Sequence, residues 1–124
     1  MGCAGFEGRP PPLSESPAWR ALAGHAQSLD GFVLRDAFAA DPGRFERFSR
    51  RLGDLLVDVS KHRATDETVR LLLALARERR VEELRDRMFA GEPINATEGR
   101  AVLHVALRDR SSRATKVDGT DIAA

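Results

Sequence analysis

The sequence predicts a mainly α-helical fold with one or two short β-strands. Two observations indicate helices. Apolar residues recur at helical spacing after Ser16-Pro17 and again after Thr65, where acidic residues open the segment and arginines close it. A third observation indicates a strand, because leucine and valine alternate with other residues between positions 54 and 61. The chain of 124 residues is long enough to form one domain with a hydrophobic core.

The chain is expected to open with a flexible segment and then a capped helix. Residues 1–13 contain three glycines and three consecutive prolines, which favours an extended or disordered segment, with polyproline docking as the alternative. Ser16 then caps a helix that has Pro17 at its first position. We interpret Trp19 as the core anchor of this helix rather than as a stacking platform for a ligand. The predicted apolar face comprises Trp19, Leu22, Ala26 and Leu29.

Two shorter helices are predicted before the strand. Asp30-Gly31 ends the first helix, and the apolar side of the second consists of Phe32, Val33, Leu34 and Phe38. Asp41-Pro42 repeats the signal of a cap followed by proline, so a third helix is expected to carry Phe45 and Phe48 on one side. Its arginines are interpreted as a solvated face, and a phosphate site is the alternative. These arginines are Arg44, Arg47, Arg50 and Arg51.

A basic turn and the clearest helix of the chain follow the predicted strand. Lys61 to Arg63 form a basic cluster, which we interpret as a solvated turn, with phosphate binding as the alternative. Thr65 is the predicted cap of the next helix, because acidic residues occupy the first turn and arginines the last. Its predicted buried stripe is Val69, Leu72, Leu73 and Ala76, widened by Leu75.

A further helix is predicted from Val81, and a distinctive stretch follows it. This helix should end at Gly91, with Leu84, Met88 and Phe89 as core candidates.

Residues 94–111 then combine a polar turn, formed by Asn95 and Thr97, with an apolar run over 101–107 that we expect to be buried apart from His104. His104 is a candidate for proton transfer, but we interpret it as a structural histidine that hydrogen-bonds the backbone. Glu98 and Arg100 are expected to form an ion pair that orders the turn rather than a catalytic pair. Further along, Asp118-Gly119 indicates a tight turn.

Composition narrows the possible partners. Twenty lysines and arginines oppose 19 aspartates and glutamates, so no strong field indicates a nucleic acid or a membrane as partner. The single cysteine, Cys3, fits a reducing compartment, and neither a signal peptide nor an apolar membrane-spanning run is apparent. We therefore expect a cytoplasmic protein.

No metal or nucleophile motif is evident either. No metal-ligand spacing connects Cys3 with the histidines His25, His62 and His104. Ser60 and Ser111 lack the Gly-x-Ser-x-Gly context of a nucleophile.

Six stretches, in chain order, resemble the glucose-6-phosphate isomerase family. The most specific is INATEGRAVLHVALRDRS, at residues 94–111, and LLVDVSKHRAT resembles the family's Leu-Val-Asp-Tyr-Ser-Lys-Asn-Arg run. Val59, His62 and Thr120 depart from the family pattern, which has Tyr, Asn and Lys there, and none falls on an expected catalytic position. The six stretches are residues 17–29, 37–49, 55–65, 88–95, 94–111 and 117–122.

The resemblance implies an enzyme of glycolysis and gluconeogenesis that interconverts glucose 6-phosphate and fructose 6-phosphate through a cis-enediol. It also implies a homodimer whose catalytic residues lie on downstream sugar-isomerase domains. The Gly-Ile-Gly-Gly-Ser and Gly-Gly-Arg-x-Ser motifs of those domains do not occur in this sequence.

We therefore expect residues 14–124 to be the helical N-terminal segment of such an enzyme, truncated before the sugar-isomerase domains. It should be inactive alone and should carry no catalytic, cofactor-binding or metal-binding residues. The alternative is a free-standing helical protein-interaction module derived from that family.

Overall fold

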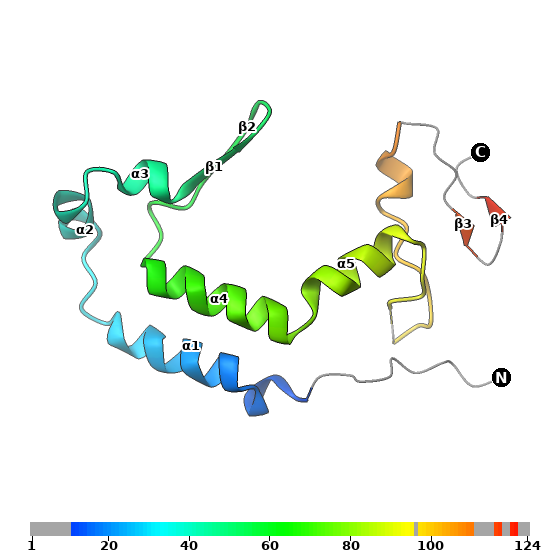
Figure 1. Ribbon diagram of the computed structural model, residues 1–124, viewed down its shortest axis with the longest axis horizontal. Helices are drawn as coiled ribbons and strands as arrows, with labels where there is room; N and C mark the ends of the chain where they lie inside the picture. Colours follow the sequence, from blue (N-terminus) through cyan, green and yellow to red (C-terminus); the bar gives the residue numbers. More distant parts are fainter. Residues whose placement is uncertain (1–10, 96, 111–115, 118–119, 122–124) are drawn as a thin grey trace. The chain divides into compact units, whose positions relative to one another are not determined.

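The computed structural model describes residues 11–95, 97–110, 116–117 and 120–121, and these form a mainly helical chain with antiparallel hairpins (Figure 1). The predicted fold class is confirmed. Two compact units are present, one comprising residues 12–75 and the other made largely of residues from 76 onward. The elements are η1 (Leu13–Glu15), α1 (Pro17–Ser28), α2 (Leu34–Ala40), α3 (Arg44–Arg47), β1 (Ser49–Leu52), β2 (Leu55–Asp58), α4 (Asp66–Glu78), α5 (Val81–Phe89), η2 (Ala106–Arg108), β3 (Lys116–Val117) and β4 (Thr120–Asp121).

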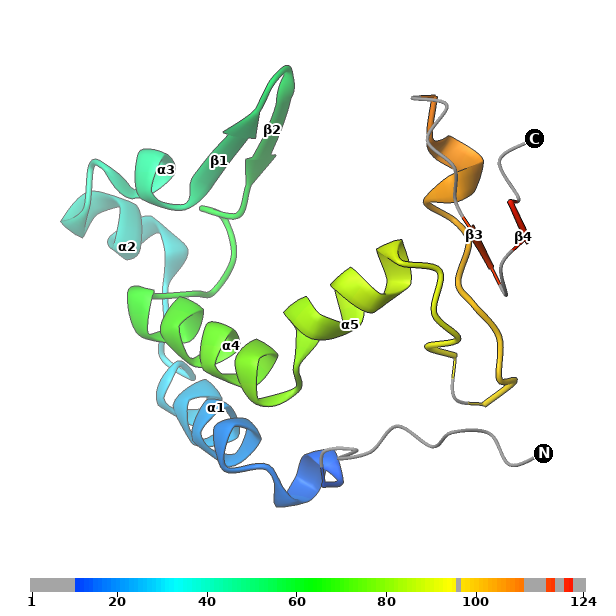
Figure 2. The same cartoon turned by 45° about the vertical axis from the view of Figure 1, so that its right-hand side comes forward.

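Helix α1 begins as predicted and lies beside α4 (Figures 1 and 2). The Ser16 side chain accepts a hydrogen bond from the Trp19 backbone N–H at 3.0 Å, and Pro17 occupies the first turn. The prediction of Trp19 as a core anchor is wrong, because 39% of this residue is exposed. Among the described residues of α1, the side that is partly covered is narrow. It consists of the half-buried Ala18, Leu22, His25 and Leu29.

Helix α4 has the predicted cap but buries a different face. The Thr65 hydroxyl oxygen accepts a hydrogen bond from the Thr68 N–H at 3.3 Å, which caps the first turn. Leu71 is the buried apolar side chain, with 6% exposure, and Thr68 and Leu75 are half-buried on the same side of the helix. The predicted stripe is therefore wrong for three of its members, because Val69, Leu72 and Leu73 are 38%, 49% and 50% exposed. Its other members, Leu75 and Ala76, are half-buried.

The predicted strand is confirmed as β2, and its partner β1 was not predicted. The two strands pair antiparallel, with Ser49 opposite Asp58 and Leu52 opposite Leu55, around a turn in which Gly53 has φ +57°. Strand β1 ends the predicted third helix early, and α3 keeps only residues 44–47. Gly43, rather than Asp41, is the cap position of α3, and no side chain caps it.

The remaining elements follow the prediction in outline. Helix α5 ends before Gly91, whose φ of +77° favours glycine. Leu84 and Met88 are half-buried, but Phe89 is 60% exposed, so its assignment to the core is wrong. Strands β3 and β4 pair antiparallel on either side of positions 118–119, and the turn predicted there lies outside the described residues.

The expected burial of residues 101–107 is also corrected. None of the side chains in this run is fully buried, and Leu107 is 84% exposed. The half-buried residues of the run are Ala101, Val102, Leu103, Val105 and Ala106, and His104 is exposed.

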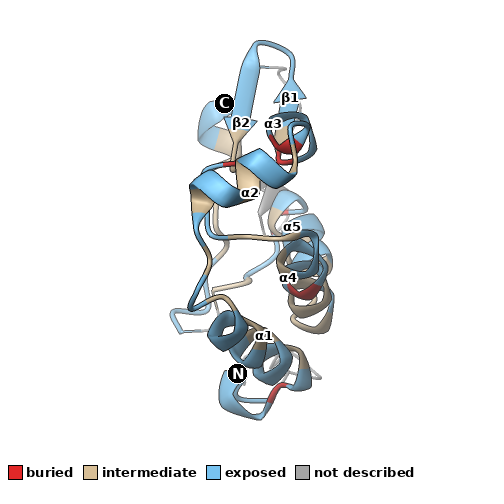
Figure 3. Ribbon diagram, turned by 90° about the vertical axis from the view of Figure 1, so that its left-hand side faces the viewer, coloured by how far each residue is buried: buried red, intermediate tan, exposed pale blue. Residues whose placement is uncertain are grey.

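Full burial is rare in this structure (Figure 3). Among the described residues, the buried apolar side chains are Phe48 and Leu71, and the buried polar ones are Ser16, Arg44 and Ser60. The predicted flexible segment, residues 1–13, lies largely outside the described residues, although Leu13 already belongs to η1.

Candidate functional site

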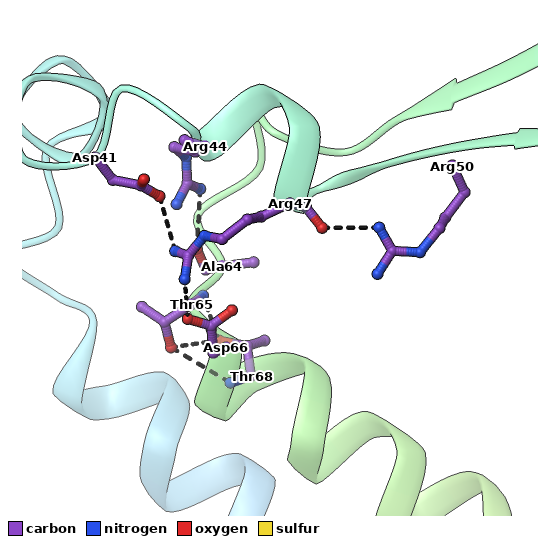
Figure 4. A network of polar contacts seen from close by, with 8 residues as sticks. All are labelled: Asp41, Arg44, Arg47, Arg50, Ala64, Thr65, Asp66 and Thr68. Carbon is purple, nitrogen blue, oxygen red and sulfur yellow. Dashed lines mark hydrogen bonds and ion pairs between the residues drawn. The ribbon is translucent and has the colours of Figure 1, made fainter.

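Among the described residues, the buried charged side chain is that of Arg44, which is 3% exposed. Its Nε donates to the carbonyl oxygen of Ser60 at 2.8 Å. Its Nη2 donates to the carbonyl oxygens of His62 at 3.0 Å and Ala64 at 2.9 Å, and Figure 4 shows it beside Ala64. The expectation that Arg44 belongs to a solvated face is therefore wrong.

Aromatic rings surround the same guanidinium. Its carbon lies 4.5 Å from the ring centroid of Phe48, 5.5 Å from that of Phe32 and 5.6 Å from that of Phe38. Ring faces attract a cation, and carbonyl oxygens satisfy its N–H groups, so the charge is stabilised here by neutral partners. Arg44 thereby fixes the segment that connects β2 to α4. It also attaches this segment to α2 and α3.

Arg47 and Arg50 lie near Arg44 but make separate contacts (Figure 4). Arg47, half exposed, bridges two carboxylates: Nη2 is 2.7 Å from Oδ2 of Asp41, and Nη1 is 2.8 Å from Oδ2 of Asp66. Nη1 of Arg50 donates to the carbonyl oxygens of Arg47 and Ser49. The three guanidinium groups are thus engaged by different protein oxygens rather than gathered around one anion position.

The basic turn at residues 61–63 is exposed, as the solvated interpretation expects. Lys61 Nζ lies 3.8 Å from Oδ2 of Asp58, and the Arg63 guanidinium donates to the carbonyl oxygen of Leu29. The Ser60 side chain and the Ser60 backbone N–H, at 2.8 Å from Oδ1, lower the pKa of Asp58 below its ordinary value. Partial burial opposes this effect, and Lys61 adds to it.

The lowered pKa of Asp58 makes the stability of the hairpin depend on pH. A carboxylate whose pKa is lower in the folded state stabilises the fold above its unfolded pKa, and this contribution disappears as the pH falls through the folded pKa. We expect D58N to be less stable than the native chain at neutral pH, with a difference that begins to shrink near about pH 4 and disappears as the pH falls through the lowered pKa of Asp58. Urea midpoints measured between neutral and strongly acidic pH test this.

The exposed carboxylate of Asp36, paired with Arg35 on α2, provides the control. D36N should follow the native chain throughout the titration. A D58N variant whose deficit stayed constant at all pH values would contradict the assigned role of the Asp58 charge.

His25 connects α1 to α4 through a small hydroxyl cluster. Its Nε2 lies 2.7 Å from Thr68 Oγ1, which also accepts the Thr65 backbone N–H at 2.9 Å. The sequence interpretation considered His25 only as a possible metal ligand and missed this contact. A signal was available, because Ala18, Leu22, His25 and Leu29 follow one another at steps of four, three and four residues.

The loop that contains Glu98 is held by Asn95, which confirms the predicted turn former. Asn95 Oδ1 accepts the backbone N–H groups of Thr97 at 3.2 Å and Glu98 at 3.3 Å, and Asn95 N–H donates to the Arg100 carbonyl oxygen at 3.1 Å. Glu98 Oε2 lies 3.5 Å from the Asn95 amide nitrogen. Within the described loop no ion pair joins Glu98 to Arg100, so that expectation is wrong.

His104 is exposed rather than a buried, hydrogen-bonded histidine. The hydrogen bond at this residue is made by its backbone carbonyl, which accepts from Nη1 of Arg108 at 3.1 Å. Over the described part of the chain, no group of three metal-ligating side chains is close enough to hold an ion. The same residues include no helix long and apolar enough to cross a membrane. The absence of catalytic and cofactor residues stays a prediction.

Comparison with known proteins supplies the family. The model described as "Phosphoglucose isomerase" matches residues 58–124. The chain is 55% identical over 112 residues to the glucose-6-phosphate isomerase of Methylococcus capsulatus, which covers 90% of this chain and 20% of that protein. It is 54% identical over 110 residues to the glucose-6-phosphate isomerase of Deinococcus deserti and to glucose-6-phosphate isomerase 2 of Streptomyces avermitilis. Each of these matches covers 89% of this chain and 20% of the relative.

The chain therefore spans about a fifth of the length of the curated relatives it matches. The family model nevertheless matches more than half of the chain, and the resemblance noted from residues 94–111 and the other stretches is confirmed. This chain belongs to the phosphoglucose isomerase family.

Proposed function

We propose that this chain acts as the N-terminal segment of a cytoplasmic glucose-6-phosphate isomerase and is inactive by itself. The observation that carries the proposal is the identity of 52–55% over about nine-tenths of the chain to proteins of that name, of which it covers only 20%. The whole enzyme would interconvert glucose 6-phosphate and fructose 6-phosphate as a homodimer. Residues 14–124 would form one helical segment of it.

The electrostatics of the described carboxylates support the inactivity of the segment. Aldose–ketose isomerisation moves a proton between adjacent carbons, which requires a base whose pKa is near neutrality. Two described carboxylates have a shifted pKa, and in both the shift is downward, away from neutrality. Ser60 lowers the pKa of Asp58, and the Arg70 side chain lowers that of Glu67. His104 is exposed and lies outside any cluster of titratable groups described above.

The distribution of exposed apolar side chains supports a role as part of a larger assembly. On α4, Leu72 and Leu73 lie one helical turn after Val69, and all three are exposed by a third or more. The hairpin adds Leu52 and Leu55, which are 80% and 60% exposed. Exposed apolar clusters of this kind typically mark sites of protein contact.

A paired activity measurement tests the proposal. In an assay that couples glucose 6-phosphate formation to a dehydrogenase, the purified chain should give no turnover of fructose 6-phosphate above the buffer blank. A chimera should be active: the Methylococcus capsulatus enzyme with its matched residues replaced by the corresponding 112 residues of this chain. The same enzyme with those residues deleted serves as the negative control.

Turnover by the purified chain alone would place a complete active site within it and contradict the proposal. A folded but inactive chimera would also contradict it, and would favour the free-standing interaction module.

A further inference from the structure

The hairpin formed by β1 and β2 exposes apolar side chains on both of its faces. Leu52, Leu55, Leu56 and Val57 are 80%, 60%, 44% and 50% exposed. Leu55 and Val57 point to one face and Leu56 to the other, because successive residues of a strand alternate. A ribbon of two strands is marginally stable in water unless a third strand or a packed layer supports it. The hairpin therefore needs a third strand or a packed layer to be stable.

The backbone of β2 offers the open edge. The Val59 N–H donates to the Phe48 carbonyl oxygen at 3.0 Å, which makes these two residues a hydrogen-bonded pair. Antiparallel pairs alternate, so the Arg50–Val57 and Leu52–Leu55 pairs also bond inward, and the N–H and C=O of Leu56 point away from β1. The opposite edge is less open, because the Arg50 guanidinium covers the Ser49 carbonyl at 2.7 Å.

A second copy of this chain is a poor partner for that edge. If two β2 strands paired antiparallel in the register centred on Leu56, Asp54 of each would face Asp58 of the other. Like charges directly opposite one another destabilise a strand pair, and here the repulsion would occur twice. The edge of β1 is equally unsuitable, because the register centred on Arg51, whose N–H and C=O point away from β2, would place Arg51 of one copy opposite Arg51 of the other.

We propose that the β2 edge pairs with a strand from the part of the isomerase that this chain does not cover. This rests on the proposed function. The uncovered part makes up about four-fifths of each relative. In the whole enzyme it belongs to the same polypeptide as the hairpin, so it is the nearest supply of a third strand. Pairing at Leu56 would give the hairpin its third strand, and the same contact would bury Leu55 and Val57 on one face and Leu56 on the other.

Hydrogen exchange in the chimera described above tests this pairing. The Leu56 amide should exchange rapidly in the free chain, and on the order of 100-fold more slowly in the chimera, because an edge N–H becomes protected when it joins a ladder. The Val57 amide, which already bonds within the hairpin, provides an internal comparison.

Charge substitution gives the second measurement. L56E should lower the thermal midpoint of the chimera but leave that of the free chain unchanged, since in the free hairpin the new carboxylate faces Arg51. L13E is the matched control, because Leu13 is 41% exposed and lies outside the hairpin. It should affect neither protein.

The outcomes separate the pairing from the proposed function. An active chimera with a rapidly exchanging Leu56 amide, or one indifferent to L56E, would overturn the pairing and leave the proposed function intact. A folded, inactive chimera with a protected Leu56 amide would support the pairing and overturn the proposed function. Protection of Leu56 that rises with the concentration of the free chain would identify a second copy as the occupant and overturn the pairing.

Discussion

Replacing Arg44 with methionine should lower the free energy of unfolding of the unit formed by residues 12–75 by on the order of 4 kcal/mol. The methionine would keep the apolar stem among the rings of Phe32, Phe38 and Phe48 but would leave three carbonyl oxygens without a donor. Hydrogen bonds from a charged donor contribute about 1.5–3 kcal/mol each, and enclosed carbonyls without a partner are costly. A unit of this size has about 3–10 kcal/mol in total. R44M should therefore lose about two-fifths or more of the stability of this unit.

Urea denaturation followed by tryptophan fluorescence measures this effect, because Trp19 is the only tryptophan and lies in the same unit. R44K should be intermediate, since an ammonium keeps the charge but cannot reach three carbonyls in the planar arrangement of a guanidinium. R35M is the control: the Arg35 side chain is 88% exposed and pairs with a neighbouring carboxylate. An R44M midpoint equal to that of R35M would show that Arg44 does not hold the segment from 60 to 64.

The sequence contains one signal for this arrangement and lacks the rest. Arg44 precedes Phe48, which is 4% exposed, by four residues, so helical spacing puts the two on one face. Arg47 and Arg50 do not share that face, whereas Arg51, seven residues after Arg44, would share it in a continuous helix. The acceptors of Arg44 are backbone carbonyls of a turn 16 to 20 residues away, and any residue type supplies a carbonyl. Composition and periodicity therefore could not identify the partners of this arginine.

Local signals were more informative than signals about packing. The caps at Ser16 and Thr65 and the helix end at Gly91 were predicted correctly, because each depends on residues within one turn. Strand β1 was missed because Ser49-Arg50-Arg51-Leu52 has no apolar alternation, and only its register with β2 makes it a strand. For the candidate site, the composition of the basic turn at 61–63 indicated its exposure but not the contacts of Asp58.

Leu71→Ala should lower the free energy of unfolding of the same unit by about 3 kcal/mol, and Leu72→Ala by less than about 1 kcal/mol. Leu71 is 6% exposed, and its truncation would leave a cavity against the neighbouring elements, whereas Leu72 is 49% exposed and already in contact with water. The two residues are adjacent on α4 and have the same chemistry and helix propensity. Their difference therefore isolates burial. Equal losses for the two variants in urea denaturation of the free chain would show that α4 packs through a different face.

The chimera should reduce this difference by raising the effect of Leu72→Ala. The apolar stripe of Val69, Leu72, Leu73 and Ala76 is what helical periodicity predicts to be buried, yet its three large members are exposed by 38–50% in this chain. The apolar periodicity of a helix reflects the contacts it makes in the whole protein, whereas the exposure in this structure depends only on contacts with the rest of this chain. If the uncovered part of the isomerase packs on this face, Leu72→Ala should destabilise the chimera by about 2 kcal/mol or more, as expected for a buried leucine. An unchanged small effect would show that this stripe stays solvated in the whole enzyme.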